Sequence, residues 1–171
     1  VVEQMATGKN ILLPSDDPIA ATRITQLNRQ QSALDQYQSN IDSATAGMSQ
    51  QESILDGVNN DLLAIRDYLL EAANGTNTAD SLASLGQDIQ SMTEAMVSAL
   101  NYQDEDGHYV FGGTVNDRPP IVAVDDDGDG VTDSYTYQGN GDHRQTTVSN
   151  GVEVDTNVAV SDFFGDSLDL S

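Results

Sequence analysis

The fold is decided by residues 17–73, which read DPIAATRITQLNRQQSALDQYQSNIDSATAGMSQQESILDGVNNDLLAIRDYLLEAA. Apolar residues recur there with a period of seven, and this series consists of Leu27, Leu34, Ile41, Met48, Leu55, Leu62 and Leu69. A second series follows three residues behind and consists of Tyr37, Ala44, Val58, Ile65 and Ala72. Spacings of three and four place both series on one side of a helix, as in a coiled coil. We therefore predict one helix over about 17–73, with an apolar seam interrupted at Gln51.

Local signals mark the ends of this helix and the start of another. Ser15-Asp16-Asp17-Pro18 places N-cap acceptors ahead of a proline, which suits a first helical turn. Asn74-Gly75 provides a C-terminal cap. A second helix is predicted over about residues 79–102, folded back as an antiparallel hairpin. It extends the seam with Leu82, Leu85, Ile89, Met92, Met96 and Ala99.

The two predicted helices differ greatly in length. At about 1.5 Å per residue, the first spans roughly 80 Å and the second about 35 Å. The second helix therefore covers less than half of the seam. Apolar surface left in water forgoes about 25 cal/mol for each Å². The sequence thus predicts that further helices or neighbouring subunits cover the rest, and that the long helix is built for assembly.

The composition changes near residue 103, where Gly, Asp, Val, Thr and Tyr become the common residues. Period-two patterns bounded by turn residues predict four short strands, at Ile121–Val124, Ser134–Gln138, Gln145–Val148 and Val152–Val154. Gly139-Asn140-Gly141-Asp142 and Asn150-Gly151 predict hairpins between the later strands. One face of the resulting small sheet is expected to be covered by Val158, Val160, Phe163, Phe164 and Leu168.

These patterns predict an α+β fold in two domains. The first is a helical rod domain over residues 1–115, a long antiparallel helical hairpin with a loop at 7–15 and an extended turn at 103–115. The second is a small antiparallel β-rich outer domain over residues 116–171. Four short strands make a marginal core, so we expect the outer domain to depend on contacts with the helices.

The overall composition excludes several classes of function. The 171 residues include 28 acidic and 6 basic side chains and no cysteine, for a formal net charge of −22. Nucleic acid and anionic membranes would be repelled by this charge, so neither is an expected partner. Without cysteine there is no disulfide, thiolate nucleophile or zinc–thiolate site. No apolar run approaches the roughly 20 residues that cross a bilayer, and the first residues do not resemble a cleavable signal peptide.

No arrangement of residues predicts catalysis. His108 and His143 are the only histidines, and nothing in the sequence places them together. No Gly-x-Ser-x-Gly elbow accompanies the serines, and the glycines near Phe111 lack the Gly-Lys-Ser/Thr ending of a phosphate-binding loop. We therefore expect that the protein is not an enzyme and requires no cofactor.

Two further sets of side chains lie on the predicted helices. Met48, Met92 and Met96 fall on the seam, where flexible thioethers commonly fill gaps between helices, so we interpret them as packing residues. Three scarce cations, Arg23, Arg29 and Arg66, have two interpretations. They pair with carboxylates of this chain or of a neighbouring subunit, or they remain solvated, because exposed ion pairs contribute little.

One acidic loop has the spacing of a cation site. In the segment that begins at Asp125, acidic residues at relative positions 1, 3, 5 and 9, with glycine at 6, match the front of an EF-hand loop. The predicted Ca²⁺ ligands are four carboxylates and one backbone carbonyl, from Asp125, Asp127, Asp129, Val131 and Asp133. Position 12, normally a bidentate Glu, is Thr136, and strands flank the loop instead of helices. The loop is therefore either a weak Ca²⁺ site or an acidic hairpin tip without an ion.

Several motifs resemble those of the flagellin superfamily. Thr7-Gly8-Lys9 and Pro14-Ser15-Asp16-Asp17-Pro18-Ile19-Ala20-Ala21 resemble its loop and helix start, and the Asp-Asp-Pro is similar to hook-associated proteins rather than filament flagellins. Asn74-Gly75-Thr76-Asn77 resembles the turn between the two helices in both branches. Gly107-His108-Tyr109-Val110-Phe111-Gly112-Gly113 is similar to the Gly-x-Tyr-x-Phe-x-Gly stretch of the hook-associated branch. Together these motifs span about residues 5–115.

This resemblance implies a structural protein of the bacterial flagellum. It implies export through the flagellar type III channel and an extracellular position in a ring of subunits, between a FlgK-type junction protein and the flagellin filament. Family members have an additional helix at each end, and the C-terminal one returns along the rod, so we interpret the chain as a core fragment. A competing hypothesis is a Ca²⁺-dependent extracellular binding or adhesion module with a helical stalk, which rests on the aspartate loop alone.

Overall fold

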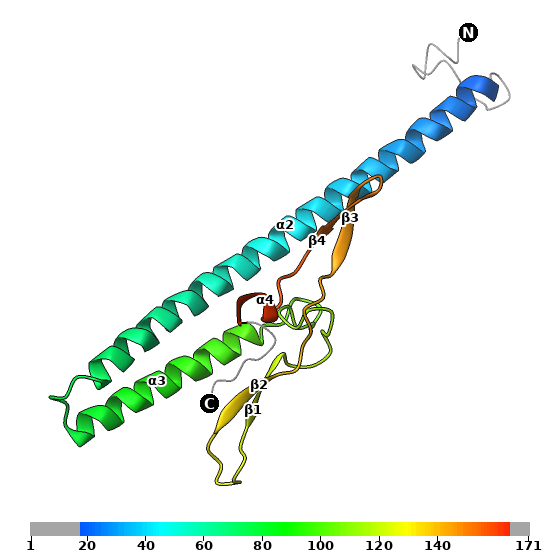
Figure 1. Cartoon of the computed structure of the whole chain (residues 1–171). Coiled ribbons are helices and arrows are strands. Elements are labelled where there is room, and N and C mark those ends of the chain that lie inside the picture. The colour runs from blue at the N-terminus through cyan, green and yellow to red at the C-terminus, as the bar shows by residue number, and fades with distance from the viewer. Residues whose placement is uncertain (1–17, 165–171) are drawn as a thin grey trace. The chain divides into compact units, whose positions relative to one another are not determined.

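The computed structural model describes residues 18–164, and two helices dominate it (Figure 1). Helix α2 spans Pro18–Ala72 and helix α3 spans Ala79–Leu100. The seven-residue period therefore corresponds to one uninterrupted helix of 55 residues. The predicted loop at 7–15, the N-cap residues before Pro18, and Leu168 lie outside the described residues.

Side chains in the turn between α2 and α3 complete both helix ends. The Asn77 side-chain amide donates to the carbonyl of Glu71 and, at 3.1 Å, to that of Asn74. These acceptors include a carbonyl of the last turn of α2, which has no partner within its own helix. Thr78 is the N-cap of α3, and its hydroxyl oxygen accepts from the Ser81 amide at 3.2 Å. The Asn-Gly-Thr-Asn motif therefore ends one helix and starts the next.

The strand predictions are largely confirmed in position. Strand β1 (Ile121–Val124) pairs antiparallel with β2 (Ser134–Tyr137), so that Ile121 faces Tyr137. Strand β3 (Gln145–Ser149) pairs with β4 (Val152–Asp155). Gly151, in the predicted hairpin turn between β3 and β4, has a φ of +72°, a value that favours glycine. A short helix, α4, spans Ser161–Phe164.

The prediction of a single four-stranded sheet is wrong, because the strands form two separate pairs. Residues 139–142 connect β2 to β3 without forming the predicted hairpin. The Asn140 amide donates to the Gly112 carbonyl at 3.1 Å, and the Asn140 side-chain oxygen accepts from the Thr114 amide at 2.9 Å. Just before this connection, the Gln138 amide donates to the Pro120 carbonyl at 2.7 Å. The connection is therefore bonded to the segment that precedes β1, which separates the two strand pairs.

The hydrophobic core joins the two helices to the region that follows them. Its buried members are Val58, Met96, Leu100, Val110, Phe111, Ile121 and Val160. Val160 was expected to cover a sheet, but it packs in this helical core instead, while Phe163 is 49% exposed. Asn101, the C-cap of α3, donates to the Ile121 carbonyl at 2.7 Å and accepts from the Ile121 amide at 2.9 Å. One side-chain amide thus pairs with β1 as a neighbouring strand would.

The elements define an α+β fold, which confirms the predicted class. Helix α3 runs back alongside the second part of α2 as an antiparallel hairpin (Figure 1). The contacts between residues divide the described part of the chain into two compact units. One consists of residues 18–42 and 147–153, and the other of residues 43–146 and 154–164. The division into a rod domain and an outer domain at residue 115 stays a prediction.

Candidate functional site

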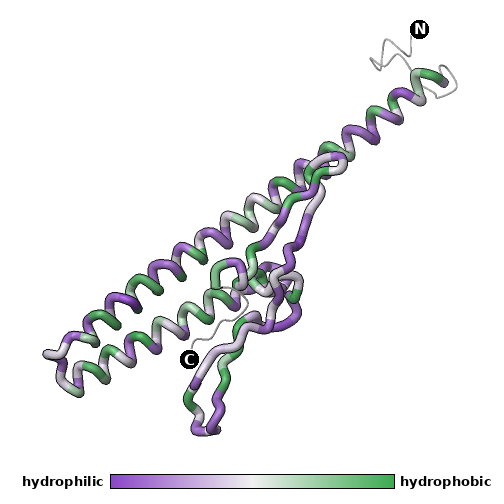
Figure 2. Tube along the Cα trace, viewed as in Figure 1, coloured by the Kyte–Doolittle hydropathy of each residue, from purple (hydrophilic) through white to green (hydrophobic). Residues whose placement is uncertain are grey.

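Many seam residues of the helices remain exposed. Leu27 and Leu34 are 62% and 60% exposed, and Leu69 is 55% exposed. The side chains of Ile41 and Leu82 are also exposed. The half-buried members are Tyr37, Ala44, Met48, Leu55, Leu62, Ile65, Ala72, Ile89, Met92 and Ala99. In Figure 2, apolar and polar residues alternate along the whole of α2, including the part of α2 that lies beyond the end of α3.

The chain's own core covers only a limited part of the seam. Val58, Leu85 and Met96 are the buried seam residues. Val58 and Met96 belong to the core, and Leu55 and Leu62 pack against it. This set explains why the seam is sheltered in the middle of the hairpin. Within residues 18–164 the seam residues Leu27 and Leu34 have no such cover.

Gln51, the interruption in the seam, is a buried attachment point. It is only 2% exposed. Its side-chain nitrogen donates to the Thr156 carbonyl at 3.1 Å, and its side-chain oxygen accepts from the Val158 amide at 2.9 Å. In the sequence Gln51 stands out only as a break in the apolar pattern, and this role was not predicted. A lone amide in an apolar series was the available signal, because buried amides need partners.

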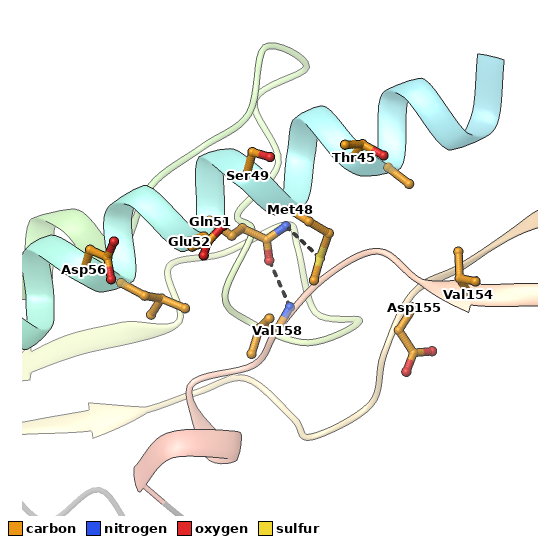
Figure 3. A pocket seen from close by; sticks show the side chains of 11 residues that line it. Thr45, Met48, Ser49, Gln51, Glu52, Asp56, Val154, Asp155 and Val158 are labelled. Carbon is orange, nitrogen blue, oxygen red and sulfur yellow. Dashed lines mark hydrogen bonds between the residues drawn. The ribbon is translucent and has the colours of Figure 1, made fainter. Parts of the chain in front are cut away.

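Beside Gln51 lies an open groove of about 510 Å³, which is lined by helix α2 and by the chain around β4. Figure 3 shows the side chains that line it, with Met48 and Val158 near Gln51. Its apolar lining comes from Ala44, Met48, Leu55, Val154 and Val158. Its charged lining is entirely acidic and comes from Glu52, Asp56 and Asp155. The groove is therefore an apolar surface with a negative border.

The Gly-x-Tyr-x-Phe-x-Gly motif forms a compact turn at the core. Gly107 has a φ of +81°, and Tyr109 bridges back to Gln103. Phe111 is fully buried, and its carbonyl accepts from the Val160 amide at 3.0 Å. Gly113 has a φ of +73°, and a Cβ there would overlap the Asn140 backbone. The motif therefore supplies one core anchor and two backbone positions that require glycine.

Replacing Gly113 with alanine is expected to cost about 2 kcal/mol of unfolding free energy, because the new Cβ adds steric overlap to an unfavourable φ. Gly151→Ala is the matched control, since Gly151 has a similar φ but open space around its Cα. That control should cost about 1 kcal/mol. Urea unfolding of both variants measures the difference. Equal losses would show that the contact with Asn140 contributes nothing.

The acidic loop brings together only part of the predicted cation site. Carboxylate oxygens of Asp125, Asp127 and Asp133 lie within 4.8 Å of one another. Asp129 is not in this group, and its side chain accepts instead from the Val131 amide at 2.7 Å. The Asp125 carboxylate accepts from the amides of Gly128 and Gly130, at 2.7 and 2.9 Å. Three exposed carboxylates are thus held close together by backbone hydrogen bonds.

The histidines do not form a catalytic pair. His108 lies 3.9 Å from the Asp104 carboxylate in an exposed turn, whereas His143 lies 3.8 Å from that of Asp162. A second close group, consisting of Asp104, Asp106 and His108, was not predicted. Burial raises the pKa of the Tyr137 phenol, and the negative charge of Asp162 raises it as well. The Tyr137 hydroxyl donates to the Asn140 carbonyl at 2.9 Å, so its role is structural.

The arginines of α2 differ in their partners. Arg66 lies 3.0 Å from the Asp67 carboxylate, and both side chains are largely exposed. Arg23 and Arg29 make no ion pair within residues 18–164. Among these same residues, no helix is apolar over a length that would cross a membrane.

The described residues thus combine a long helix that has an exposed apolar seam, a second helix folded back on it and two small strand pairs. Residues 1–116 match the family described as the bacterial flagellin N-terminal helical region, and the chain belongs to this family. Two similar proteins are named flagellar hook-associated protein 3. The one from Escherichia coli K12 is 36% identical over 119 residues, and the one from Salmonella typhimurium LT2 is 35% identical over 119 residues. The match covers 70% of this chain but only 38% of each relative.

Solved structures agree with this assignment. A structure assigned as a flagellar hook-associated protein, from Vibrio parahaemolyticus, is 35% identical with a TM-score of 0.77, over 88% of this chain and 64% of that one. The fold is also shared with FlgL from Xanthomonas campestris, at 19% identity and a TM-score of 0.64, over 77% of this chain and 41% of that one. The resemblance to hook-associated proteins of the FlgL type is thereby confirmed. The chain therefore belongs to a family of structural proteins of the bacterial flagellum, an extracellular appendage, and this family is not enzymatic.

Proposed function

We propose that the chain belongs to a subunit of the hook–filament junction, which joins a FlgK-type junction protein to the flagellin filament. The hook-associated relatives support this position in the flagellum. The observation that carries the mechanism is the exposure of Leu27 and Leu34 on a continuous helix of 55 residues. A stripe of this kind gains free energy when another surface covers it and removes it from water.

In this function the helices act mechanically. Rods lie side by side in a ring of subunits, and the seam residues bury their apolar surface against neighbouring rods. Knobs-into-holes packing of a heptad seam resists bending and sliding, because each side chain fits among four from the partner. The type III export channel is the proposed route out of the cell. The strand pairs add contact surface beside the rod.

The test is a substitution that disrupts the seam without disturbing the folded chain. In a motile cell, Leu34→Asp introduced into the full protein is expected to abolish filament attachment, because a carboxylate cannot be buried in an apolar contact without a large penalty. Ser32→Asp is the matched control, since Ser32 is exposed on the opposite side of α2. Electron microscopy counts filaments per cell, and swimming in soft agar gives motility.

Both substitutions replace exposed residues, so the isolated proteins should retain their melting temperature within about 2 °C. Filaments of normal number in cells with Leu34→Asp would contradict the proposed function. Equal loss with Ser32→Asp would assign the effect to added charge rather than to the seam.

We also propose that the acidic loop binds Ca²⁺, the basis of the competing function as a binding module. The supporting observation is the convergence of Asp125, Asp127 and Asp133 within 4.8 Å. Carboxylate oxygens are the ligands that Ca²⁺ prefers, and the missing Glu at Thr136 limits the affinity to the millimolar range of extracellular sites. Such an ion would hold the ends of β1 and β2 together and would offset the repulsion among the carboxylates.

Calcium is expected to raise the stability of the chain by about 1.4 kcal/mol at ten times its dissociation constant. Asp125→Asn should abolish this gain, since it removes one converging carboxylate. Asp117→Asn, at an exposed residue outside the loop, should retain it. Thermal unfolding with and without millimolar CaCl₂, at constant ionic strength, measures the effect. An equal response of all three proteins would show general screening only.

A further inference from the structure

An asparagine precedes a glycine at three places in the chain, which are Asn74-Gly75, Asn140-Gly141 and Asn150-Gly151. In such a pair the backbone nitrogen of the glycine attacks the side-chain carbonyl carbon of the asparagine, because glycine has no side chain to obstruct the approach. The local chemistry is the same in all three pairs. Differences in their reactivity therefore come from the structure around them.

The side chain of Asn140 is half-buried and held by hydrogen bonds. Its oxygen accepts from the Thr114 amide at 2.9 Å, and its nitrogen donates to the Thr114 hydroxyl at 2.8 Å. The same nitrogen donates to the Asp142 carboxylate at 3.0 Å. Rotation of this side-chain amide into the path of the Gly141 nitrogen requires that these bonds break. The structure therefore protects the second pair.

The reacting groups of the first pair are free, in the turn between α2 and α3 at the closed end of the helical hairpin (Figure 1). Asn74 and Gly75 are both exposed. Among residues 18–164, neither the Asn74 side chain nor the Gly75 amide makes a hydrogen bond. The backbone of Asn74 is held, by contrast, since its amide donates to the Glu71 carbonyl at 3.0 Å and its carbonyl accepts from the Asn77 side chain at 3.1 Å.

We propose that Asn74 is a site of spontaneous covalent modification, at which the Gly75 nitrogen closes a succinimide ring on the Asn74 side chain. The nitrogen forms a bond to the side-chain carbonyl carbon and gives up its proton, and the side-chain nitrogen leaves as ammonia. Water then opens the ring at either carbonyl and yields aspartate or isoaspartate. Because water is the only other reactant, this modification is independent of the proposed junction function.

The third pair provides an internal reference. Asn150 and Gly151 are exposed in the turn between β3 and β4. Among the described residues the Asn150 side chain and the Gly151 amide make no hydrogen bond, as at Asn74. We therefore expect Asn150 to be modified as well, and Asn140 to persist.

The two products at Asn74 change the turn in different ways. Aspartate leaves the path of the backbone unchanged but adds a negative charge beside the C-terminal end of α2, where negative charge is unfavourable. Isoaspartate routes the main chain through the former side chain and so inserts a carbon atom between Asn74 and Gly75. The hydrogen bonds from Asn77 to the Glu71 and Asn74 carbonyls depend on the original path. The modified turn should therefore open more readily.

Incubation of the 171-residue chain in mildly alkaline buffer, followed by proteolysis and mass spectrometry, tests the proposal. The signature is the mass increase that accompanies replacement of a side-chain amide by a carboxylate, located by peptide fragmentation. In the folded chain Asn74 and Asn150 should be converted about tenfold faster than Asn140, because its hydrogen bonds must open first. In denaturing guanidinium chloride the three rates should converge. Conversion of Asn74 no faster than that of Asn140 in the folded chain would overturn the proposal.

Gly75→Ala is the matched variant. A Cβ at Gly75 would meet nothing within 4 Å, and Gly75 is not among the glycines with a positive φ, so the variant should keep the fold. The new Cβ obstructs the attacking nitrogen, so conversion should be lost at Asn74 and unchanged at Asn150. An unchanged rate at Asn74 would show that the Gly75 amide is not the nucleophile and would contradict the proposal. After ageing, amide hydrogen exchange at Asn77 should be faster in the original chain than in Gly75→Ala, and equal exchange would refute the effect on the turn.

Discussion

Phe111→Ala is expected to destabilise the unit that contains the core by about 3 to 5 kcal/mol, the largest effect of any single substitution considered. Phe111 is fully buried among Leu100, Ile121 and Val160, where α3, β1 and the segment before α4 meet. Removing the ring leaves a cavity that these side chains fill only in part. Because several elements share this anchor, they should loosen together. Urea unfolding, followed by tyrosine fluorescence and circular dichroism, measures the loss.

Phe163→Ala is the matched control for this substitution. Phe163 is 49% exposed and does not belong to the core, so its loss should cost about 1 kcal/mol or less. The same residue type is thus removed from two environments within one chain. If the two variants lost similar amounts of unfolding free energy, the core around Phe111 would not be the main source of the chain's stability.

The helices were predictable because their signal is local and repeated. The seven-residue series along Leu27, Leu55 and Leu69 extends over six repeats, and each repeat adds independent support for one helix. The position of the turn between α2 and α3 was predictable from its residues, because Asn77 and Thr78 make the hydrogen bonds that complete the two helix ends. Strands β1 to β4 were located by the same kind of local evidence.

The pairing of strands was not predictable in the same way. Gly139 to Asp142 resembles a hairpin turn, yet Asn140 bonds to Gly112 and Thr114, which lie more than 25 residues earlier in the chain. Contacts of that kind depend on where the Gly-Gly segment lies after α3 ends. No local pattern contains that information, so the two strand pairs were mistaken for one sheet.

The acidic loop shows a similar limit. Spacing alone predicted four carboxylates around an ion, because an EF-hand loop wraps its ligands in order. Here the loop joins two strands, and Asp129 turns to bond the Val131 amide. The flanking strands therefore select which carboxylates meet. The sequence supplied the candidates, and the backbone path of the loop determined that Asp125, Asp127 and Asp133 converge.

At Gln51, Gln51→Leu is expected to destabilise the chain by about 2 to 3 kcal/mol, although it would make the apolar series continuous. Leucine leaves the half-buried Thr156 carbonyl without its donor and the Val158 amide without its acceptor. Each unpaired group costs about 1 to 3 kcal/mol. Added apolar burial offsets part of this cost. Urea unfolding gives the total, and amide hydrogen exchange at Val158 reports whether the segment has detached.

Two further variants separate hydrogen bonding from packing. Gln51→Glu retains the acceptor for the Val158 amide but loses the donor to Thr156, so Val158 should stay better protected than in Gln51→Leu. Gln50→Leu, at the exposed neighbouring position, should leave exchange at Val158 unchanged. If Gln51→Leu proved as stable as the original chain, the amide would be replaceable by an ordinary seam residue. The prediction is the opposite, because α2 meets an extended segment here, whose backbone groups need a polar partner that leucine does not offer.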